Sequence, residues 1–105
     1  MYDFKDRVLL LTGAAGGIGQ AIAEVFEDTG AKLLLADMDE ARLRSMAARL
    51  NADRCAIARY DAAAPHDATA VVDACVRRYG RIDFAVPAAA IYEEVRFAEM
   101  SDEQW

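Results

Sequence analysis

The sequence of 105 residues has little basic charge, few cysteines and no long apolar run. Its 12 Lys and Arg are outnumbered by 18 Asp and Glu, and a net charge of −6 argues against a nucleic-acid-binding protein, which needs a basic face. Cys55 and Cys75 form neither a disulfide framework nor a metal-binding spacing, and the single histidine, His66, has no second ligand at such a spacing. No apolar run approaches the roughly 20 residues of a membrane span, and the charged N-terminus is unlike a signal peptide. These absences predict a cytoplasmic protein that binds no nucleic acid, no membrane and no metal.

Short apolar runs alternate with longer stretches of helical period. The unbroken run at 8–11 is typical of a strand buried on both faces, as in a parallel sheet, and we expect further strands at 33–36, 55–58 and 82–86. This βαβαβαβ alternation predicts an α/β fold with helices on both faces of a parallel sheet, and the length allows a single domain over 1–105. In the first expected helix, which ends at Gly30, the inner face consists of Ile18, Ile22, Val25 and Phe26. The second begins after an Asp39 cap, and its inner face consists of Leu43, Met46, Ala47 and Leu50. The third has Pro65 in its first turn and ends at Gly80, and its inner face consists of Val71, Val72, Cys75 and Tyr79.

Four of the six glycines fall within residues 12–19, directly after the first predicted strand and at the start of the first predicted helix. This is the context that a dinucleotide-binding turn requires. Gly13 would allow the tight turn, a glycine in the middle would let backbone N–H groups approach a pyrophosphate, and Gly19 would let the helix pack closely on the sheet. The free N–H groups and the positive dipole end of the helix would then face the phosphates.

Asp37 ends the second predicted strand. A carboxylate in that position can accept the hydroxyls of the adenosine ribose, and it repels the extra phosphate of NADP. No Arg or Lys occupies position 14, 15 or 38 to offset this charge. The sequence therefore predicts NAD(H) rather than NADP(H) as the cofactor.

With these residues in order, the chain resembles the short-chain dehydrogenase/reductase family. The family pattern T-G-x-x-x-G-I-G is complete here, and Gly80-Arg81-Ile82-Asp83 matches the family's G-x-I-D. The resemblance implies a three-layer, doubly wound Rossmann-type sheet in the order 3-2-1-4, a small alcohol or ketone substrate, hydride transfer and homo-oligomers. It also implies that Asp61 binds the adenine amino group. The cofactor-binding set so predicted is Thr12, Gly13, Ala15, Gly16, Gly17, Ile18, Gly19, Asp37, Met38, Asp61, Ala62, Ala88, Ala89 and Ala90.

Two features depart from the family pattern. Pro87-Ala88-Ala89-Ala90 stands where the family usually carries Asn-Asn-Ala-Gly, and proline fits poorly in a central strand. An altered nicotinamide pocket or a protein without catalysis therefore stays open. The family's Ser and Tyr-x-x-x-Lys have no counterpart in these 105 residues, so we assign no catalytic residue.

The last residues, 101–104, have the form of a helix capping box, with Met100 and Trp105 as a hydrophobic staple. Because a helix would begin where the sequence ends, we expect these residues to belong to a longer chain. If instead they are complete, the alternative is a non-catalytic nucleotide-binding or interaction module. A third alternative, an S-adenosylmethionine-dependent methyltransferase, fits the spacing of residues 12–19 less well. An isolated chain would leave the apolar strand at 82–86 on a sheet edge, so we expect it to self-associate there or to be poorly soluble.

Overall fold

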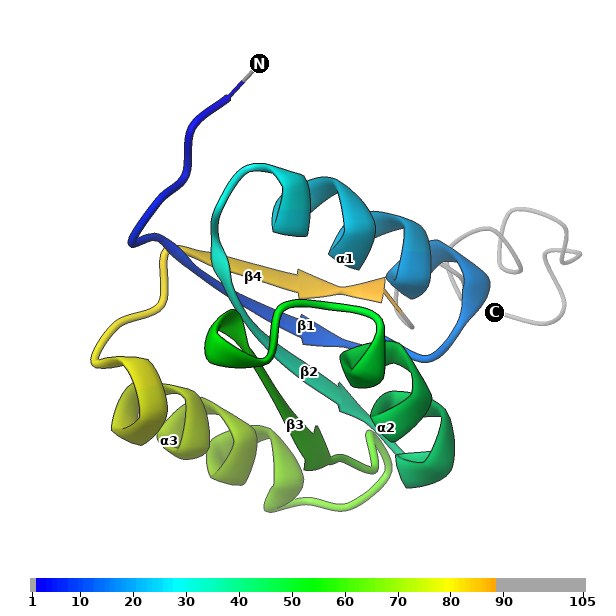
Figure 1. Cartoon of the computed structure of the whole chain (residues 1–105). Helices are drawn as coiled ribbons and strands as arrows, with labels where there is room; N and C mark the ends of the chain where they lie inside the picture. Colours follow the sequence, from blue (N-terminus) through cyan, green and yellow to red (C-terminus); the bar gives the residue numbers. More distant parts are fainter. Residues whose placement is uncertain (1, 89–105) are drawn as a thin grey trace, which may run out of the picture.

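A computed structural model describes residues 2–88 of the chain, which form one parallel sheet with strand order β3-β2-β1-β4 (Figure 1). Helices alternate with the strands, so the predicted α/β fold and strand order are confirmed. The capping box at 101–104 and its staple residues lie outside the described residues, as do Ala89 and Ala90. The elements are β1 (Val8–Thr12), α1 (Gly17–Asp28), β2 (Lys32–Asp37), α2 (Glu40–Ala48), the 3-10 turn η1 (Ala52–Arg54), β3 (Cys55–Arg59), α3 (Asp67–Tyr79) and β4 (Phe84–Pro87).

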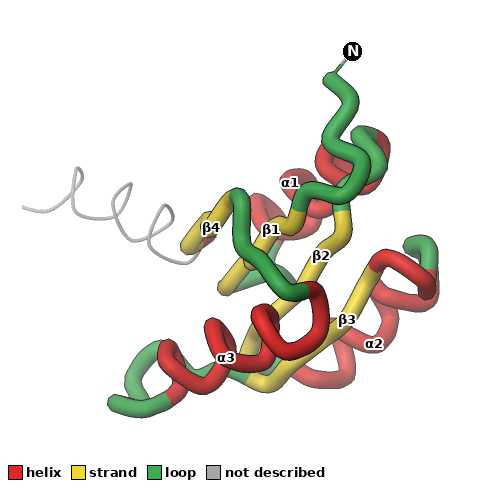
Figure 2. The backbone as a smooth tube through the Cα atoms, turned by 90° about the vertical axis from the view of Figure 1, so that its left-hand side faces the viewer, coloured by secondary structure: helices red, strands yellow, loops and turns green. Residues whose placement is uncertain are grey.

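The sheet is the middle of three layers. α1 and α2 cover one face, and α3 covers the other (Figure 2). Along β1, Leu9 and Leu11 pack toward α1 and α2, while Val8 and Leu10 pack toward α3. The apolar run at 8–11 is therefore buried on both faces, as its unbroken pattern predicts.

The inner face of α1 agrees with the expected one only in part. Ile18 and Val25 are 42% and 63% exposed, and the buried residues of this helix are Gly19 and Ala23. Small residues on the inner face let α1 lie close to the strands. The other two expected residues, Ile22 and Phe26, are partly buried and pack against the core cluster, as predicted. The helical spacing of apolar residues was present in the sequence, but the close contact between helix and sheet places the small residues, instead of Ile18 and Val25, against the strands.

The other two helices follow the sequence more closely. In α2 the Asp39 carboxylate accepts a hydrogen bond from the N–H of Arg42 at 3.0 Å, and Leu43 and Met46 are buried. α3 begins at Asp67 with His66 as N-cap, so Pro65 precedes the helix instead of lying in its first turn. It ends at Gly80. No helix among residues 2–88 is long and apolar enough to cross a membrane.

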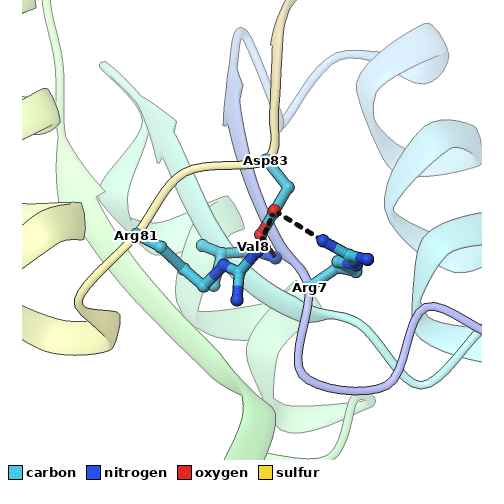
Figure 3. Close-up of polar contacts among 4 residues, drawn as sticks. All are labelled: Arg7, Val8, Arg81 and Asp83. Atoms are coloured by element: carbon cyan, nitrogen blue, oxygen red, sulfur yellow. Dashed lines mark hydrogen bonds and ion pairs between the residues drawn. The ribbon is translucent and has the colours of Figure 1, made fainter.

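β4 is fixed to β1 by the Asp83 cluster, which consists of Arg7, Val8, Arg81 and Asp83 (Figure 3). The Asp83 carboxylate accepts hydrogen bonds from the N–H of Val8 at 2.8 Å and from the Arg81 guanidinium at 2.7 Å, with Arg7 at 3.4 Å. The Arg81 bond is the largest of the effects that hold the pKa of Asp83 below its usual value. The strand expected at 82–86 starts only at Phe84. Asp83 is joined to Val8 twice, because its carboxylate accepts from the N–H of Val8 and its own N–H donates to the carbonyl of Val8 at 2.9 Å.

Pro87 lies in β4, opposite Thr12 of β1. The N–H of Lys32 donates to the carbonyl of Arg7 at 2.8 Å, so the backbone polar groups of residues 7, 9 and 11 face β2 and those of residues 8, 10 and 12 face β4. In this register the backbone groups of Phe84 and Val86 face β1. The nitrogen of Pro87, which carries no hydrogen, therefore faces away from β1, toward the outer edge of β4. Among residues 2–88, β4 is the outermost strand of the sheet. Proline is tolerated on the outer side of such a strand, so the β1–β4 pairing loses no hydrogen bond to it.

Candidate functional site

The predicted cofactor residues gather where β1, β2 and β3 end. The N–H of Ala14 donates to the carbonyl of Ala36 at 3.1 Å, and the N–H of Tyr60 donates to the carbonyl of Asp37 at 3.0 Å. The first bond joins the glycine-rich turn, residues 13–16 between β1 and α1, to the end of β2. The second joins the end of β2 to the end of β3 (Figure 1). The carboxyl edge of a parallel sheet is the usual place for a ligand in α/β proteins.

Two glycines shape the turn between β1 and α1. Gly13 has a positive φ of 69°, which confirms its predicted role in the tight turn. At Gly19 a Cβ atom would lie 2.7 Å from both the Cα and the carbonyl oxygen of Ala14, and closer still to the carbonyl oxygen of Gly13. The close approach that requires glycine at position 19 is therefore to the backbone of the turn itself, not to a strand as the sequence suggested.

The first turn of α1 offers backbone donors without partners. Gly16 is the N-cap and supplies no side-chain bond, and the first backbone bond at this end of the helix is from the N–H of Gln20 to the carbonyl of Gly16, at 2.9 Å. Among the described residues, nothing accepts from the N–H groups of Gly17, Ile18 and Gly19. A Cβ at Gly17 would meet no atom within 4 Å, so packing does not require glycine there. An exposed helix start with three free donors and no acidic residue in its first turn suits an anion.

The carboxylate of Asp37 lies beside this turn. Its Oδ2 accepts a hydrogen bond from the N–H of Ala15 at 3.1 Å, and its Oδ1 accepts one from the N–H of Asp39 at 3.0 Å. The residue is partly exposed, so the remaining lone pairs can reach a ligand. The Ala15 contact has no local sequence signal, because 22 positions separate the two residues.

Sequence reasoning also missed Gln20. Its Nε2 donates to the carbonyl of Ala15 at 2.9 Å, which joins the middle of the turn to the second turn of α1. The N–H and the carbonyl of Ala15 are thus both used within the protein, and its side chain is buried. Ala15 therefore belongs to the framework of the site, and its N–H is already used by Asp37.

The loop after β3 is ordered by its own acidic residues. The Asp61 carboxylate accepts from the N–H of Ala63 at 2.9 Å, while the N–H of Asp61 donates to the Asp67 carboxylate at 2.8 Å. Ala62, between these bonds, is exposed. Met38, which follows Asp37 at the end of β2, is 57% exposed. The site edge therefore carries apolar surface next to its carboxylates.

Ala88, the last described residue, is only 3% exposed and packs in the core cluster that α1 and α2 cover. Its side chain is thus turned into the protein. The other two predicted cofactor residues of this segment, Ala89 and Ala90, lie outside the described range.

Within the part of the chain that the structure describes, the cysteines and the histidine have no catalytic partners. Burial, with a smaller contribution from Glu27, raises the pKa of Cys55 to about 11, and burial also raises the pKa of Cys75. Cys55 packs on the sheet face that α1 and α2 cover, and Cys75 packs on the face under α3, so the two thiols are separated by the sheet. His66 is exposed at the start of α3. Residues 2–88 contain no cluster of three or more side chains able to hold a metal ion.

Comparison with known proteins places this geometry in a family. The short chain dehydrogenase family model matches residues 7–105. The D-threitol dehydrogenase of Mycolicibacterium smegmatis is 34% identical over 108 residues, covering 99% of this chain and 42% of that protein.

Two crystal structures are similar in fold and sequence. A short-chain dehydrogenase/reductase from Brucella melitensis, described as a glucose/ribitol dehydrogenase, has a TM-score of 0.77 and 45% identity, over 80% of this chain and 36% of that one. A second, from Burkholderia phymatum in complex with NAD, has a TM-score of 0.74 and 32% identity, over 81% of this chain and 31% of that one. The chain spans less than half the length of each of these relatives. Because the family model covers nearly all of its residues, the chain belongs to the short-chain dehydrogenase family.

Proposed function

We propose that the protein binds NAD(H) at the carboxyl edge of its sheet and acts as an oxidoreductase on a small alcohol or ketone. The observation that carries this proposal is the set of three free N–H groups in the first turn of α1, beside the partly exposed carboxylate of Asp37. A diphosphate needs such donors, and the adjoining ribose needs an acceptor for its hydroxyls. The Burkholderia phymatum relative, which was crystallised with NAD, supports the choice of ligand.

Each part of the site has a separate task in this proposal. The N–H groups of Gly17, Ile18 and Gly19 hold the diphosphate, Asp37 accepts from the adenosine ribose, and exposed Met38 offers an apolar surface for the adenine. By family resemblance, Asp61 and Ala62 complete the adenine side. When bound, the nicotinamide supplies or receives the hydride, while the protein fixes its position and excludes water.

Asp37 also favours NAD⁺ over NADP⁺. A 2′-phosphate would lie next to its carboxylate, and like charges at a few ångströms repel each other. Isothermal titration of the protein with NAD⁺ and NADP⁺ tests both statements. We expect NAD⁺ to bind at least about tenfold more tightly, which corresponds to about 1.4 kcal/mol. Equal or tighter binding of NADP⁺ contradicts the role of Asp37, and binding of neither cofactor contradicts the proposed site.

A non-catalytic nucleotide-binding protein is the second candidate. The sequence Pro87-Ala88-Ala89-Ala90 favours it, because these residues lack the side-chain amides that the family usually places there. The two candidates differ in one measurement. An oxidoreductase shows substrate-dependent change in the absorbance of NADH when the full-length protein is screened against alcohols and ketones, whereas a binding module shows cofactor binding alone. Family membership gives no support to the methyltransferase alternative.

The remaining parts of the proposal rest on the sequence and the family resemblance. They are a homo-oligomeric state and a cytoplasmic location for the full-length protein. Light scattering coupled to gel filtration measures the first, and fractionation of cells expressing the tagged protein measures the second.

A further inference from the structure

We propose that Asp37 is a positioning residue for the glycine-rich turn, in addition to the ribose contact that the proposed function gives it. The inference starts from the hydrogen bond between Asp37 Oδ2 and the N–H of Ala15, which joins the end of β2 to the middle of the turn. It rests on the proposed function only in its consequence for dinucleotide binding. The hydrogen bond itself is a property of the free protein.

The peptide groups around Ala15 are held from three directions. The Asp37 carboxylate accepts from the N–H of Ala15, and Gln20 donates to its carbonyl. The preceding N–H, that of Ala14, donates to the carbonyl of Ala36. Two of these three bonds come from the end of β2, so the path of the turn is set by the neighbouring strand as well as by its own sequence.

The turn needs such bonds because it has few side chains to hold it. Gly16 and Gly17 are exposed, and the only bond within the turn, from the N–H of Gly16 to the carbonyl of Gly13, is long at 3.3 Å. An anion site made of backbone N–H groups binds well only if those groups are already in place, because ordering them on binding lowers the affinity. Because of the Asp37–Ala15 bond, the backbone N–H groups of the turn are already ordered when the protein has folded, before any ligand binds.

One carboxylate can do both tasks. An ionised carboxylate has about four positions at which it can accept hydrogen bonds. The N–H groups of Ala15 and Asp39 occupy one position on each oxygen of Asp37, at 3.1 Å and 3.0 Å. One position on each oxygen is left for the two hydroxyls of a ribose. The two backbone donors also fix the orientation of the carboxylate, so that these positions have a defined direction.

The two roles of Asp37 make opposite predictions for a ligand without ribose hydroxyls. The probe is an NAD⁺ analogue that carries 2′,3′-dideoxyadenosine, which gives Asp37 nothing to accept. If Asp37 only binds the ribose, Asp37→Ala leaves the affinity for the analogue unchanged or raises it, because a negative charge near the diphosphate is removed. If Asp37 also positions the turn, Asp37→Ala weakens binding of the analogue, and we expect a loss of about tenfold from one charge-assisted hydrogen bond.

Asp39→Ala is the matched control. It removes a neighbouring carboxylate of the same charge that caps α2 through the N–H of Arg42. Its side chain forms no hydrogen bond with the turn. Titration calorimetry should show unchanged affinity of Asp39→Ala for the analogue, and thermal unfolding of both variants shows that each is folded at the titration temperature. An equal loss of affinity in Asp37→Ala and Asp39→Ala overturns the proposal.

A second measurement needs no ligand and separates this inference from the proposed function. In the free protein, amide hydrogen exchange of Ala15 should become at least about tenfold faster in Asp37→Ala than in the wild type, and Asp39→Ala should leave it unchanged. Unchanged exchange of Ala15 overturns the positioning role whatever the protein binds. If exchange rises as expected but the wild type binds neither NAD⁺ nor the analogue, the positioning role stands and the proposed function fails.

Gln20→Ala covers the case in which Asp37→Ala does not fold. It removes the hydrogen bond to the carbonyl of Ala15 and leaves the Asp37 carboxylate in place. If the position of Ala15 controls the free N–H groups of α1, this variant should lose severalfold in affinity for NAD⁺ and for the analogue alike. Full affinity for both ligands in Gln20→Ala, with faster exchange at Ala15, contradicts the proposed link between the turn and binding.

Discussion

The turn between β1 and α1 makes a sharp prediction, because two glycines in the same helix turn have opposite surroundings. A Cβ at Gly19 would lie 2.7 Å from two backbone atoms of Ala14, whereas a Cβ at Gly17 would meet nothing within 4 Å. We therefore expect Gly19→Ala to destabilise the protein and Gly17→Ala to leave its stability unchanged or raise it.

The magnitudes follow from general costs of packing and of backbone freedom. Alanine is about 1 kcal/mol more favourable than glycine in a helix interior, so propensity alone would make Gly19→Ala stabilising. The contact is with backbone, which cannot rotate away, and overpacking of this kind costs about 1–3 kcal/mol. Because the atoms lie so close, we take the upper part of this range, and after subtraction of the helix propensity we expect the free energy of unfolding to fall by about 1–2 kcal/mol. At Gly17 the gain from a less flexible unfolded chain is about 0.4–1 kcal/mol.

For dinucleotide binding, in contrast to stability, Gly17→Ala is the variant that we expect to have the damaging effect. The open space at Gly17 is where the proposed diphosphate approaches, so a methyl group there should lower NAD⁺ affinity by at least about tenfold, as loss of one hydrogen bond to a charged group does. Urea unfolding gives the stabilities, and titration calorimetry gives the affinities. A stable Gly17→Ala that binds NAD⁺ as tightly as the wild type would refute the placement of the diphosphate, and an undiminished stability of Gly19→Ala would refute the contact with Ala14.

Three further predictions concern residues away from the turn. Asp83 has a lowered pKa, so its contribution to stability is complete above its unfolded pKa of about 3.9 and is lost as the pH falls through its folded pKa. Urea unfolding between pH 2 and 7 should therefore show that Asp83→Asn loses less stability in acid than the wild type does. Parallel curves for the two proteins would contradict this. Because the pKa of Cys55 is about 11, its thiol at pH 8 should react with a disulfide reagent about a hundredfold more slowly in the folded than in the unfolded protein. Pro87→Ala should change the free energy of unfolding by less than about 1 kcal/mol, because the missing N–H lies on the outer edge of β4, and a larger loss would mean that the pairing with β1 is in another register.

The sequence predicted the parts of this fold that local pattern controls. The unbroken run at 8–11 indicated a strand buried on both faces, and Asp39 and Gly80 marked helix ends where the structure has them. The failures arise where packing decides. Ile18 and Val25 fit the helical period, yet α1 turns its smallest residues, Gly19 and Ala23, to the sheet, and no periodicity reveals how close a helix will lie.

The candidate site divides in the same way. Gly13 and Asp37 could be chosen from the sequence because each has a local signal, a turn directly after a strand and an acid at a strand end. Gln20 could not, because a glutamine on the first turns of a helix is an ordinary surface residue until its partner, the carbonyl of Ala15, is known.

Pro87 shows why register carries information that residue type does not. A proline in a strand removes one N–H, and its cost depends on which edge of the strand that N–H would face. The bond from Lys32 to Arg7 fixes which residues of β1 face β2, and the pairing of Thr12 with Pro87 carries this alternation into β4. The alternation places the gap on the outer edge, where it leaves the strands under the glycine-rich turn fully paired. Pro87, which the sequence suggested would fit poorly in the sheet, therefore affects only what can pair with the outer edge of β4. The geometry of the site at Thr12 and Gly13 is preserved.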